Sequence, residues 1–259
     1  MSAGVLSRLL AGPLSVALIS RMHLPRLTPG PALATRLSGG QRSRAAMTTA
    51  TPDAFAAYMT AEPAPETKGF VMQQTMLRVK DPFKSLDFYT KVLGFKLLMY
   101  KQFPQWGFSV FFVAPRHDPL PEGDDARWEQ CMRTPGCIEL TWNHGSETEA
   151  APMVYNTGNA DATGTVDGQP IKGGFGHIGI TCADVYAACE RFQALGAVIH
   201  KSPNAGGMKG LAFIKDPDNY LIEILPHAYD LTTGAMPTQP IDCMGIKLDG
   251  GAGYKDNSK

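Results

Sequence analysis

Four polar side chains stand at matching points of two similar halves of this 259-residue sequence: Gln74, Glu139, His177 and Glu223. Gln74 and His177 are 103 residues apart, and each lies in a β-type run. The two glutamates lie in the triplets Ile-Glu-Leu and Ile-Glu-Ile. Because side chains alternate across a strand, each glutamate faces away from its apolar neighbours. For either glutamate alone, a solvent-facing position is the simpler interpretation.

The combination of these four residues predicts a metal site. One imidazole, two carboxylates and an amide oxygen suit a borderline-hard divalent cation, and four ligands leave octahedral positions open for a substrate. The five cysteines have no C-x-x-C spacing, so neither a thiolate zinc site nor a disulfide framework is indicated. The other histidines have no counterpart in the opposite half and are interpreted as surface or core residues: His23, His117, His144, His200 and His227.

Two copies of one structural unit must position these residues. The first copy is predicted to contain a strand at 71–79, a helix at 82–93 capped by Asp81, and strands at 95–103, 108–114 and 137–142. The second is predicted to contain a strand at 176–182, a helix at 185–195 capped by Asp184, and strands at 197–202, 210–216 and 220–225. Each copy is too small to bury a sheet face alone, so the copies should pack together. The predicted fold class is α+β, with two tandem β-α-β-β-β modules.

The predicted organisation has a transit peptide, an arm, a two-module domain and a tail. The segments are 1–46 for the transit peptide, 47–70 for the arm with a short helix near 53–59, modules 71–144 and 175–227, and a mobile tail at 228–259. A Gly-rich and Thr-rich connection, 145–174, joins the modules, and a long polar insert follows Ala114.

The N-terminal segment has the composition of an organelle transit peptide. It contains six of the 24 Lys and Arg residues, and no acidic residue precedes Asp53. This predicts import into a plastid or mitochondrion, and Met47 offers an alternative start that would give a cytosolic form. The alternative is a disordered basic tail that binds an anionic partner. Without the segment, 18 basic residues face 24 acidic ones, which argues against nucleic acid as a partner. No run approaches eighteen apolar residues, so no membrane span is expected.

Several stretches carry a resemblance to a known family. They are QQTMLRVKDP (73–82), SLDFYTKVLGF (85–95), IELT (138–141), GFGHIGI (174–180), MKGLAFIKDPD (208–218) and IEIL (222–225). Over about residues 70–226 the chain resembles the glyoxalase I family, whose activity is lactoylglutathione lyase, within the vicinal oxygen chelate superfamily. The resemblance implies curved sheets that form a metal-binding cleft.

The resemblance implies that Gln74, Glu139, His177 and Glu223 are the metal ligands. The implied substrate is the hemithioacetal of methylglyoxal and glutathione, whose vicinal oxygens chelate the ion while an enediolate forms. Glu223 matches the family's proton acceptor and donor between C1 and C2, and Glu139 matches the equivalent role for the other epimer. The implied product is S-D-lactoylglutathione.

Further positions match the family's glutathione contacts: Arg78, Asn143, Lys201 and Met208. The family usually has Arg immediately before GFGH, where this chain has Gly173, and Lys172 is the candidate to supply that charge. The arm and the insert resemble the longer, zinc-type members rather than the nickel-type ones.

The resemblance and the ligand distribution also predict a homodimer with shared sites. Each module supplies only two ligands, and a 30-residue connection lets modules pair across two chains. Gln74 and Glu139 of one subunit would then meet the partner's His177 and Glu223. Two alternatives stay open: an extradiol-type dioxygenase, which needs His where Gln74 stands, and a binding module with a degenerate site.

Overall fold

The computed structural model describes residues 53–158, 164–166, 169–171, 173–230, 233 and 235–248. The chain divides into one unit that ends at Pro63 and a second unit from Ala64 onward. In the first unit, helix α1 spans Asp53–Thr60, as predicted. The proposed transit peptide and Lys172 lie outside the described residues. No helix in the described ranges is both long and apolar enough to cross a membrane.

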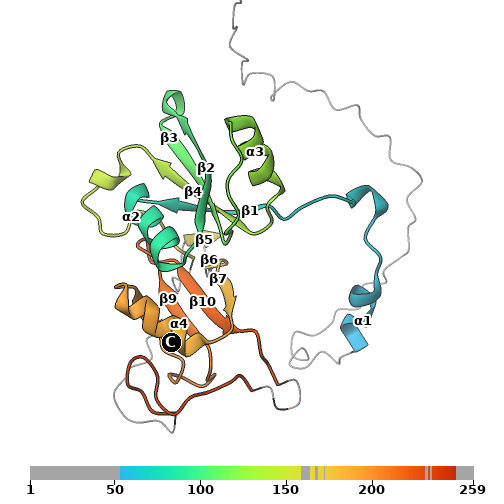
Figure 1. The fold of residues 1–259 in the computed structure, drawn as a ribbon, viewed down its shortest axis with the longest axis vertical. Coiled ribbons are helices and arrows are strands. Elements are labelled where there is room, and N and C mark those ends of the chain that lie inside the picture. The colour runs from blue at the N-terminus through green and yellow to red at the C-terminus, as the bar shows by residue number, and fades with distance from the viewer. Residues whose placement is uncertain are drawn as a thin grey trace, which may run out of the picture. The chain divides into compact units, whose positions relative to one another are not determined.

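The second unit contains two modules with the same topology (Figure 1). In the first, the strands are β1 (Gln74–Val79), β2 (Lys96–Phe103), β3 (Phe108–Ala114) and β4 (Cys137–Asn143), and helix α2 (Pro82–Asp87) continues as a π turn over Phe88–Val92. In the second, the strands are β7 (Ile178–Cys182), β8 (Val198–Lys201), β9 (Ala212–Lys215) and β10 (Leu221–Pro226), with helix α4 at Val185–Ala194. The sheet orders are β1-β4-β3-β2 and β7-β10-β9-β8, each with its first and last strands parallel. The predicted fold class is confirmed.

The same capping residue starts the helix in both modules. The Asp81 carboxylate accepts hydrogen bonds from the amides of Phe83 and Lys84. The Asp184 carboxylate accepts them from Tyr186 and Ala187. Each aspartate satisfies two amides that have no partner inside the first helical turn. The two modules therefore share the hydrogen bonds that start their helices as well as the spacing of their residues.

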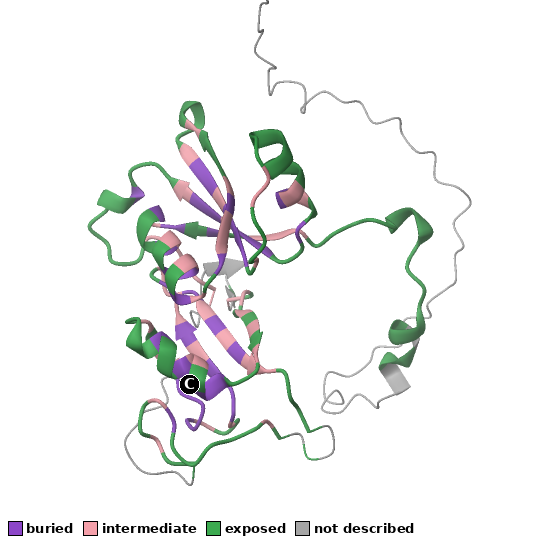
Figure 2. Ribbon diagram, viewed as in Figure 1, coloured by how far each residue is buried: buried purple, intermediate pink, exposed green. Residues whose placement is uncertain are grey.

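One hydrophobic core joins the two modules. Its fully buried residues include Val79 and Leu140 from the first sheet and Ile214, Ile222 and Ile224 from the second. Figure 2 shows the buried residues concentrated in the strands of both sheets. The side of each sheet that carries its helix supplies these residues, because Tyr89 and Val92 on one helical segment and Cys189 and Phe192 on the other belong to the same cluster. The modules pack together, as their small size predicted.

The insert and the connection contain elements that the sequence analysis did not anticipate. Within the insert, α3 spans Asp124–Arg133, with two acidic residues in its first turn and Arg133 in its last, an order that suits the helix dipole. Within the connection, β5 (Gly164–Val166) pairs with β6 (Gln169–Ile171). Helix α3 is strongly polar, and β5 and β6 have only three residues each, so hydrophobic periodicity gave no signal for them.

Part of the C-terminal tail, for which the sequence predicts mobility, contacts the second module. Buried Asn204 donates its side-chain amide to the carbonyls of Gln239, at 3.1 Å, and Ile246, at 2.9 Å. The backbone amide of Asn204 donates to Asp242 Oδ2 at 2.9 Å. One buried asparagine thus holds residues 235–248 against the loop that follows β8.

Candidate active site

Gln74 and Glu139 form a polar pair on the first sheet. In the parallel register of β1 with β4, Glu139 stands opposite Met76, two residues after Gln74. The Gln74 side-chain amide donates to Glu139 Oε2, and Thr141 Oγ1 donates to Glu139 Oε1 at 3.3 Å. Burial raises the pKa of Glu139, while these two hydrogen bonds act to lower it. The result is a shielded, oriented carboxylate.

His177 and Glu223 form the equivalent pair on the second sheet. Glu223 stands opposite Gly179, again two residues after its partner. The His177 Nε2 atom lies 3.0 Å from Glu223 Oε2. The predicted strand at 176–182 begins only at Ile178, so His177 precedes β7 by one residue. Its ring packs edge-on against Phe213, with ring centroids 5.2 Å apart, which fixes its orientation.

Both pairs lie on the sheet faces opposite the shared core. Glu139 is flanked by buried Ile138 and Leu140, which are 5% and 0% exposed, and Glu223 by Ile222 and Ile224, both 0% exposed. Among the described residues, no three His, Cys, Asp or Glu side chains gather as a metal-binding group. The structure therefore brings the four predicted ligands together as two pairs, not as one four-ligand site within a chain.

The donor chemistry of the two pairs fits a divalent ion. The pairs supply one imidazole, two carboxylates and one amide, and oxygen and nitrogen donors of this kind suit Zn²⁺ and Ni²⁺ alike. The Gln74 amide presents its NH₂ group to Glu139. A half-turn of the amide would present its oxygen instead, because the two ends have nearly the same shape. Gln74 can therefore change from hydrogen-bond donor to metal ligand without moving the strand.

Two of the predicted glutathione contacts, Arg78 and Asn143, lie on the ligand-bearing face of the first sheet. Strand alternation places Arg78 on the side of Gln74, and Asn143 on the side of Glu139. Arg78 is exposed and borders a cavity of about 400 Å³. The Asn143 side-chain amide donates to the Tyr155 hydroxyl at 3.0 Å.

The other predicted contacts have different surroundings. Lys201 is buried, 6% exposed, and its ammonium donates to the Leu211 carbonyl at 2.8 Å. Met208 is 64% exposed. The Lys201 ammonium therefore lies against the main chain, whereas the Met208 side chain is accessible.

Sequence reasoning missed Tyr155 and Phe175, which border the same cavity as Arg78. Gly158 approaches Phe175 so closely that an added Cβ would lie 2.6 Å from the Phe175 carbonyl oxygen. This contact holds the start of the connection against Phe175, which lies three residues before β7, and both border the cavity beside β1. The connection has no apolar periodicity, so only its glycine and aromatic residues carried a signal.

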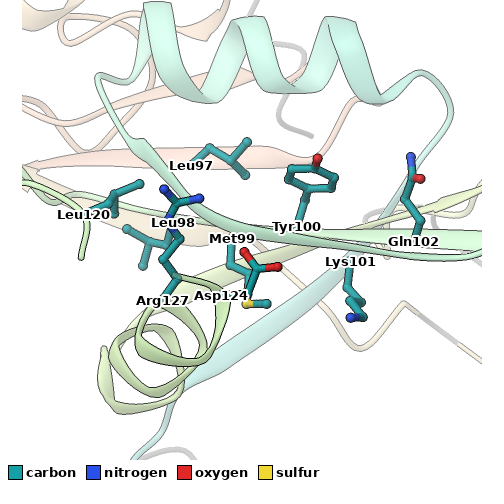
Figure 3. A pocket seen from close by; sticks show the side chains of 9 residues that line it. All are labelled: Leu97, Leu98, Met99, Tyr100, Lys101, Gln102, Leu120, Asp124 and Arg127. Carbon is teal, nitrogen blue, oxygen red and sulfur yellow. The ribbon is translucent and has the colours of Figure 1, made fainter. Parts of the chain in front are cut away.

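A second cavity, of about 530 Å³, lies between β2 and α3. Figure 3 shows Asp124 and Arg127 projecting from α3 toward β2. Met99 and Lys101 lie on the side of the strand that faces α3. Met99 stands opposite Phe112, which stands opposite Glu139, so this cavity borders the ligand-bearing face. A small apolar cluster lies on the same face and includes Phe112, the neighbour of Glu139: Leu98, Val110, Phe112, Ala114, Cys131 and Cys137. The cluster helps to explain the shielding of Glu139.

Comparisons with known proteins agree with this architecture. Residues 71–224 match the Glyoxalase/Bleomycin resistance protein/Dioxygenase superfamily. The chain is 47% identical over 169 residues to a lactoylglutathione lyase of Pseudomonas putida, which covers 64% of this chain and 91% of that enzyme. It is 42% identical over 165 residues to a lactoylglutathione lyase of Pseudomonas aeruginosa, with 63% and 86% coverage.

A solved structure of Leishmania major glyoxalase I aligns with a TM-score of 0.41 at 25% identity, over 61% of this chain and 86% of that one. The match to the superfamily extends across both modules and includes all four residues of the two polar pairs. The duplicated topology and this match lead to one conclusion. The chain is a member of the Glyoxalase/Bleomycin resistance protein/Dioxygenase superfamily.

Proposed function

We propose that this chain is a lactoylglutathione lyase, which isomerises the hemithioacetal of methylglyoxal and glutathione to S-D-lactoylglutathione. The observation that carries the proposal is the 47% identity to the Pseudomonas putida enzyme over 91% of its length. The two polar pairs support it, because they are arranged alike: in each sheet the glutamate on the last strand stands opposite the residue two positions after its partner. This activity would detoxify methylglyoxal.

One divalent ion per site is part of the proposal, with Zn²⁺ preferred to Ni²⁺ on the resemblance to longer family members. When bound, the ion supplies Lewis acidity to the substrate's vicinal oxygens. The residues that would hold it are Gln74, Glu139, His177 and Glu223, whose donor types fit such an ion.

Glu223 moves the proton in this mechanism. Its carboxylate accepts the proton from C1 of the hemithioacetal and returns it to C2. The side chain is only 16% exposed, so little bulk water reaches the carboxylate to exchange that proton. The nearby His177 imidazole orients the carboxylate at 3.0 Å. Glu139, shielded and held by Thr141, serves the other epimer of the substrate.

The active protein is proposed to be a twofold-symmetric homodimer with two shared sites. Both ligand pairs lie on the faces opposite the core that joins the modules. In this proposal, each four-ligand site is completed by combining one pair from a chain with the other pair from its partner. Residues on and near the start of β1 also expose apolar surface suited to such an interface: Phe70 at 81%, Met72 at 75% and Met76 at 42%.

Arg78 and Asn143 from the first module, and Lys201 and Met208 from the second, are proposed to receive glutathione, with Lys172 of the connection as a further candidate. The exposed guanidinium of Arg78 supports its role in binding a carboxylate. Lys201 would have to release the Leu211 carbonyl before its ammonium could meet a substrate carboxylate.

Residues 1–46 are proposed to direct the protein to a plastid or mitochondrion. Six arginines and the absence of acids in this segment support the proposal. Fusion of the segment to a fluorescent reporter tests it: accumulation in an organelle is expected, and diffuse cytosolic signal would contradict it.

The experiment that tests the activity uses purified protein stripped of metal by a chelator and reconstituted with Zn²⁺ or Ni²⁺. Methylglyoxal and glutathione are mixed to form the hemithioacetal, and the absorbance of the thioester product is followed. Product is expected only with metal present. A metal-loaded protein that consumes oxygen with a catechol, and forms no thioester, would be a dioxygenase instead. A protein inactive in both assays would be a binding module.

A further inference from the structure

The cavity beside Arg78 has the chemistry of a carboxylate site. Arg78 is the cation in its lining, and no Asp or Glu is among the described residues that form it. Tyr155, Asn156 and Thr157 add a phenol, an amide and a hydroxyl to the same wall. A volume of about 400 Å³ exceeds what a carboxylate needs and suits the end of a peptide. A ligand that carries a negative charge, with hydrogen-bonding groups next to that charge, would match the cation and the polar groups of this lining.

The wall that carries Tyr155 is fastened at both ends. At its beginning, the Lys80 ammonium donates to the carbonyls of Glu149, at 2.7 Å, and Ala151, at 2.6 Å. At its end, Gly158 adopts a φ of +86° and lies against Phe175. Phe175 in turn packs edge-on against Tyr220, with ring centroids 6.2 Å apart. The start of the connection is thus positioned by contacts with both modules.

Tyr155 is hydrogen-bonded to one of the proposed glutathione contacts and lines the same cavity as the other. Its hydroxyl oxygen accepts the hydrogen bond from Asn143. A phenol that accepts one hydrogen bond still has its own hydrogen to donate. Within the described part of the chain that hydrogen meets no acceptor, and the Tyr155 side chain lines the cavity that Arg78 borders.

Resting on the proposed function, we infer that Tyr155 is a substrate-positioning residue: it orients Asn143 and donates its hydroxyl hydrogen to the glutathione carboxylate that Arg78 receives. The start of the connection is then one wall of the tripeptide site, and the group it recognises is a terminal carboxylate of the peptide. Removing the hydroxyl weakens binding of the substrate and its transition state equally, because the carboxylate is remote from the reacting carbons.

Steady-state kinetics of the metal-loaded full chain test the inference through Tyr155→Phe. The KM for the hemithioacetal is expected to rise about tenfold, as loss of a hydrogen bond to a charged group implies. The kcat is expected to stay within about twofold. Tyr229→Phe, a change at an exposed tyrosine away from the cavity, is the matched control and should change neither constant. An unchanged KM in Tyr155→Phe, with wild-type protein active, overturns the inference alone, whereas inactive wild-type protein overturns the proposed function.

Binding measurements do not need turnover and identify the recognised group. Calorimetry compares S-hexylglutathione with its two truncated forms, S-hexyl-cysteinylglycine and S-hexyl-γ-glutamylcysteine. Tyr155→Phe is expected to weaken S-hexylglutathione and one truncated form about tenfold, and to leave unchanged the form that lacks the recognised carboxylate. Equal weakening of all three ligands would show a merely structural effect and would overturn the inference.

A second variant moves the wall without touching the hydroxyl. Gly158→Ala places a Cβ against the Phe175 carbonyl and a strained φ on an L residue, so the segment that carries Tyr155 must shift. Its KM is expected to rise with kcat retained, and circular dichroism checks that the fold persists. A folded Gly158→Ala protein with wild-type KM would contradict the role of this wall.

Discussion

The Tyr89 hydroxyl donates a 3.1 Å hydrogen bond to Asp216 Oδ2 and thereby joins the first module to the second in the protein interior. Both residues are buried, at 0% and 4% exposure. The other carboxylate oxygen of Asp216 accepts the backbone amides of Asp218 and Tyr220, each at 2.9 Å. Burial, assisted by the negative charge of Asp218, raises the pKa of Asp216 to about 7.

This raised pKa predicts that stability falls as pH rises. The folded protein holds a proton on Asp216 that the unfolded chain, with a pKa of about 4, has already lost. The free energy of unfolding should therefore decrease between about pH 4 and pH 7, by at most about 1.4 kcal/mol per pH unit from this group, and level off above that range. Urea denaturation at pH 5, 6, 7 and 8 measures the slope.

The control for this prediction is Asp216→Asn, which keeps the shape and cannot titrate. Its unfolding free energy should show a smaller decrease with pH than that of the wild type over the same range. Identical slopes in the two proteins would show that other groups, and not Asp216, cause the pH dependence.

Glu223→Gln should keep a divalent ion but lose nearly all turnover, because an amide cannot accept the proton. A positioned base usually contributes at least about a hundredfold to the rate. Metal content and kcat are measured on the same preparation. Glu190→Gln, at an exposed site on α4, is the matched control and should keep wild-type kcat. Retention of more than about a tenth of wild-type kcat by Glu223→Gln would reassign the base.

Shared active sites predict complementation between two inactive variants. Glu139→Ala and Glu223→Ala proteins are mixed, unfolded, refolded together and assayed. A mixed dimer contains one intact site, so random pairing should restore about a quarter of wild-type activity. If each site were formed within a single chain, every mixture would be inactive, because each chain lacks one of its glutamates. No recovery, with the mixed dimer demonstrated, would therefore rule out shared sites.

Gly210→Ala should destabilise the protein and loosen the tail. An added Cβ would lie 2.7 Å from both Met236 Cβ and the Pro237 carbonyl oxygen, at a φ of +81°. Gly196→Ala is the matched control, with a φ of +80° and nothing within 4 Å of the added Cβ. The control should lose about 1 kcal/mol from the backbone alone, and Gly210→Ala about 1 to 3 kcal/mol more.

Urea denaturation measures both losses, and limited proteolysis reports release of residues 235–248. Equal losses of unfolding free energy in the two variants would mean that the tail moves away from the added methyl group without destabilising the protein. In that case the contact at Gly210 would not hold the tail against the second module.

Much of the candidate site could be predicted because its signals are local or periodic. The residue types of the proposed metal ligands follow from the matching positions of Gln74 and His177, and of Glu139 and Glu223. The side of the sheet that each glutamate faces follows from strand alternation. Asp81 and Asp184 marked the helix starts, because a capping residue acts on amides only two and three residues away.

Other features depended on contacts between distant segments. Lys201 and Arg78 are both cations on strands, yet Lys201 is buried against the Leu211 carbonyl and Arg78 is exposed beside a cavity. Tyr155 reaches Asn143 from a connection without periodicity. The position of a side chain in such a segment is decided by long-range packing, for which spacing along the chain has no signal.

The sequence by itself determined the duplicated α+β topology, the residues that could bind a metal and their division between two modules. Only the tertiary structure decided which faces of the modules meet. The faces that carry α2 and α4 supply the larger apolar cluster, and they form the shared core around Leu140 and Ile224. The opposite faces, which carry Glu139 and Glu223, are consequently directed away from that core. Burial of apolar surface is non-directional, and which faces it joins is a property of the whole fold rather than of any one strand.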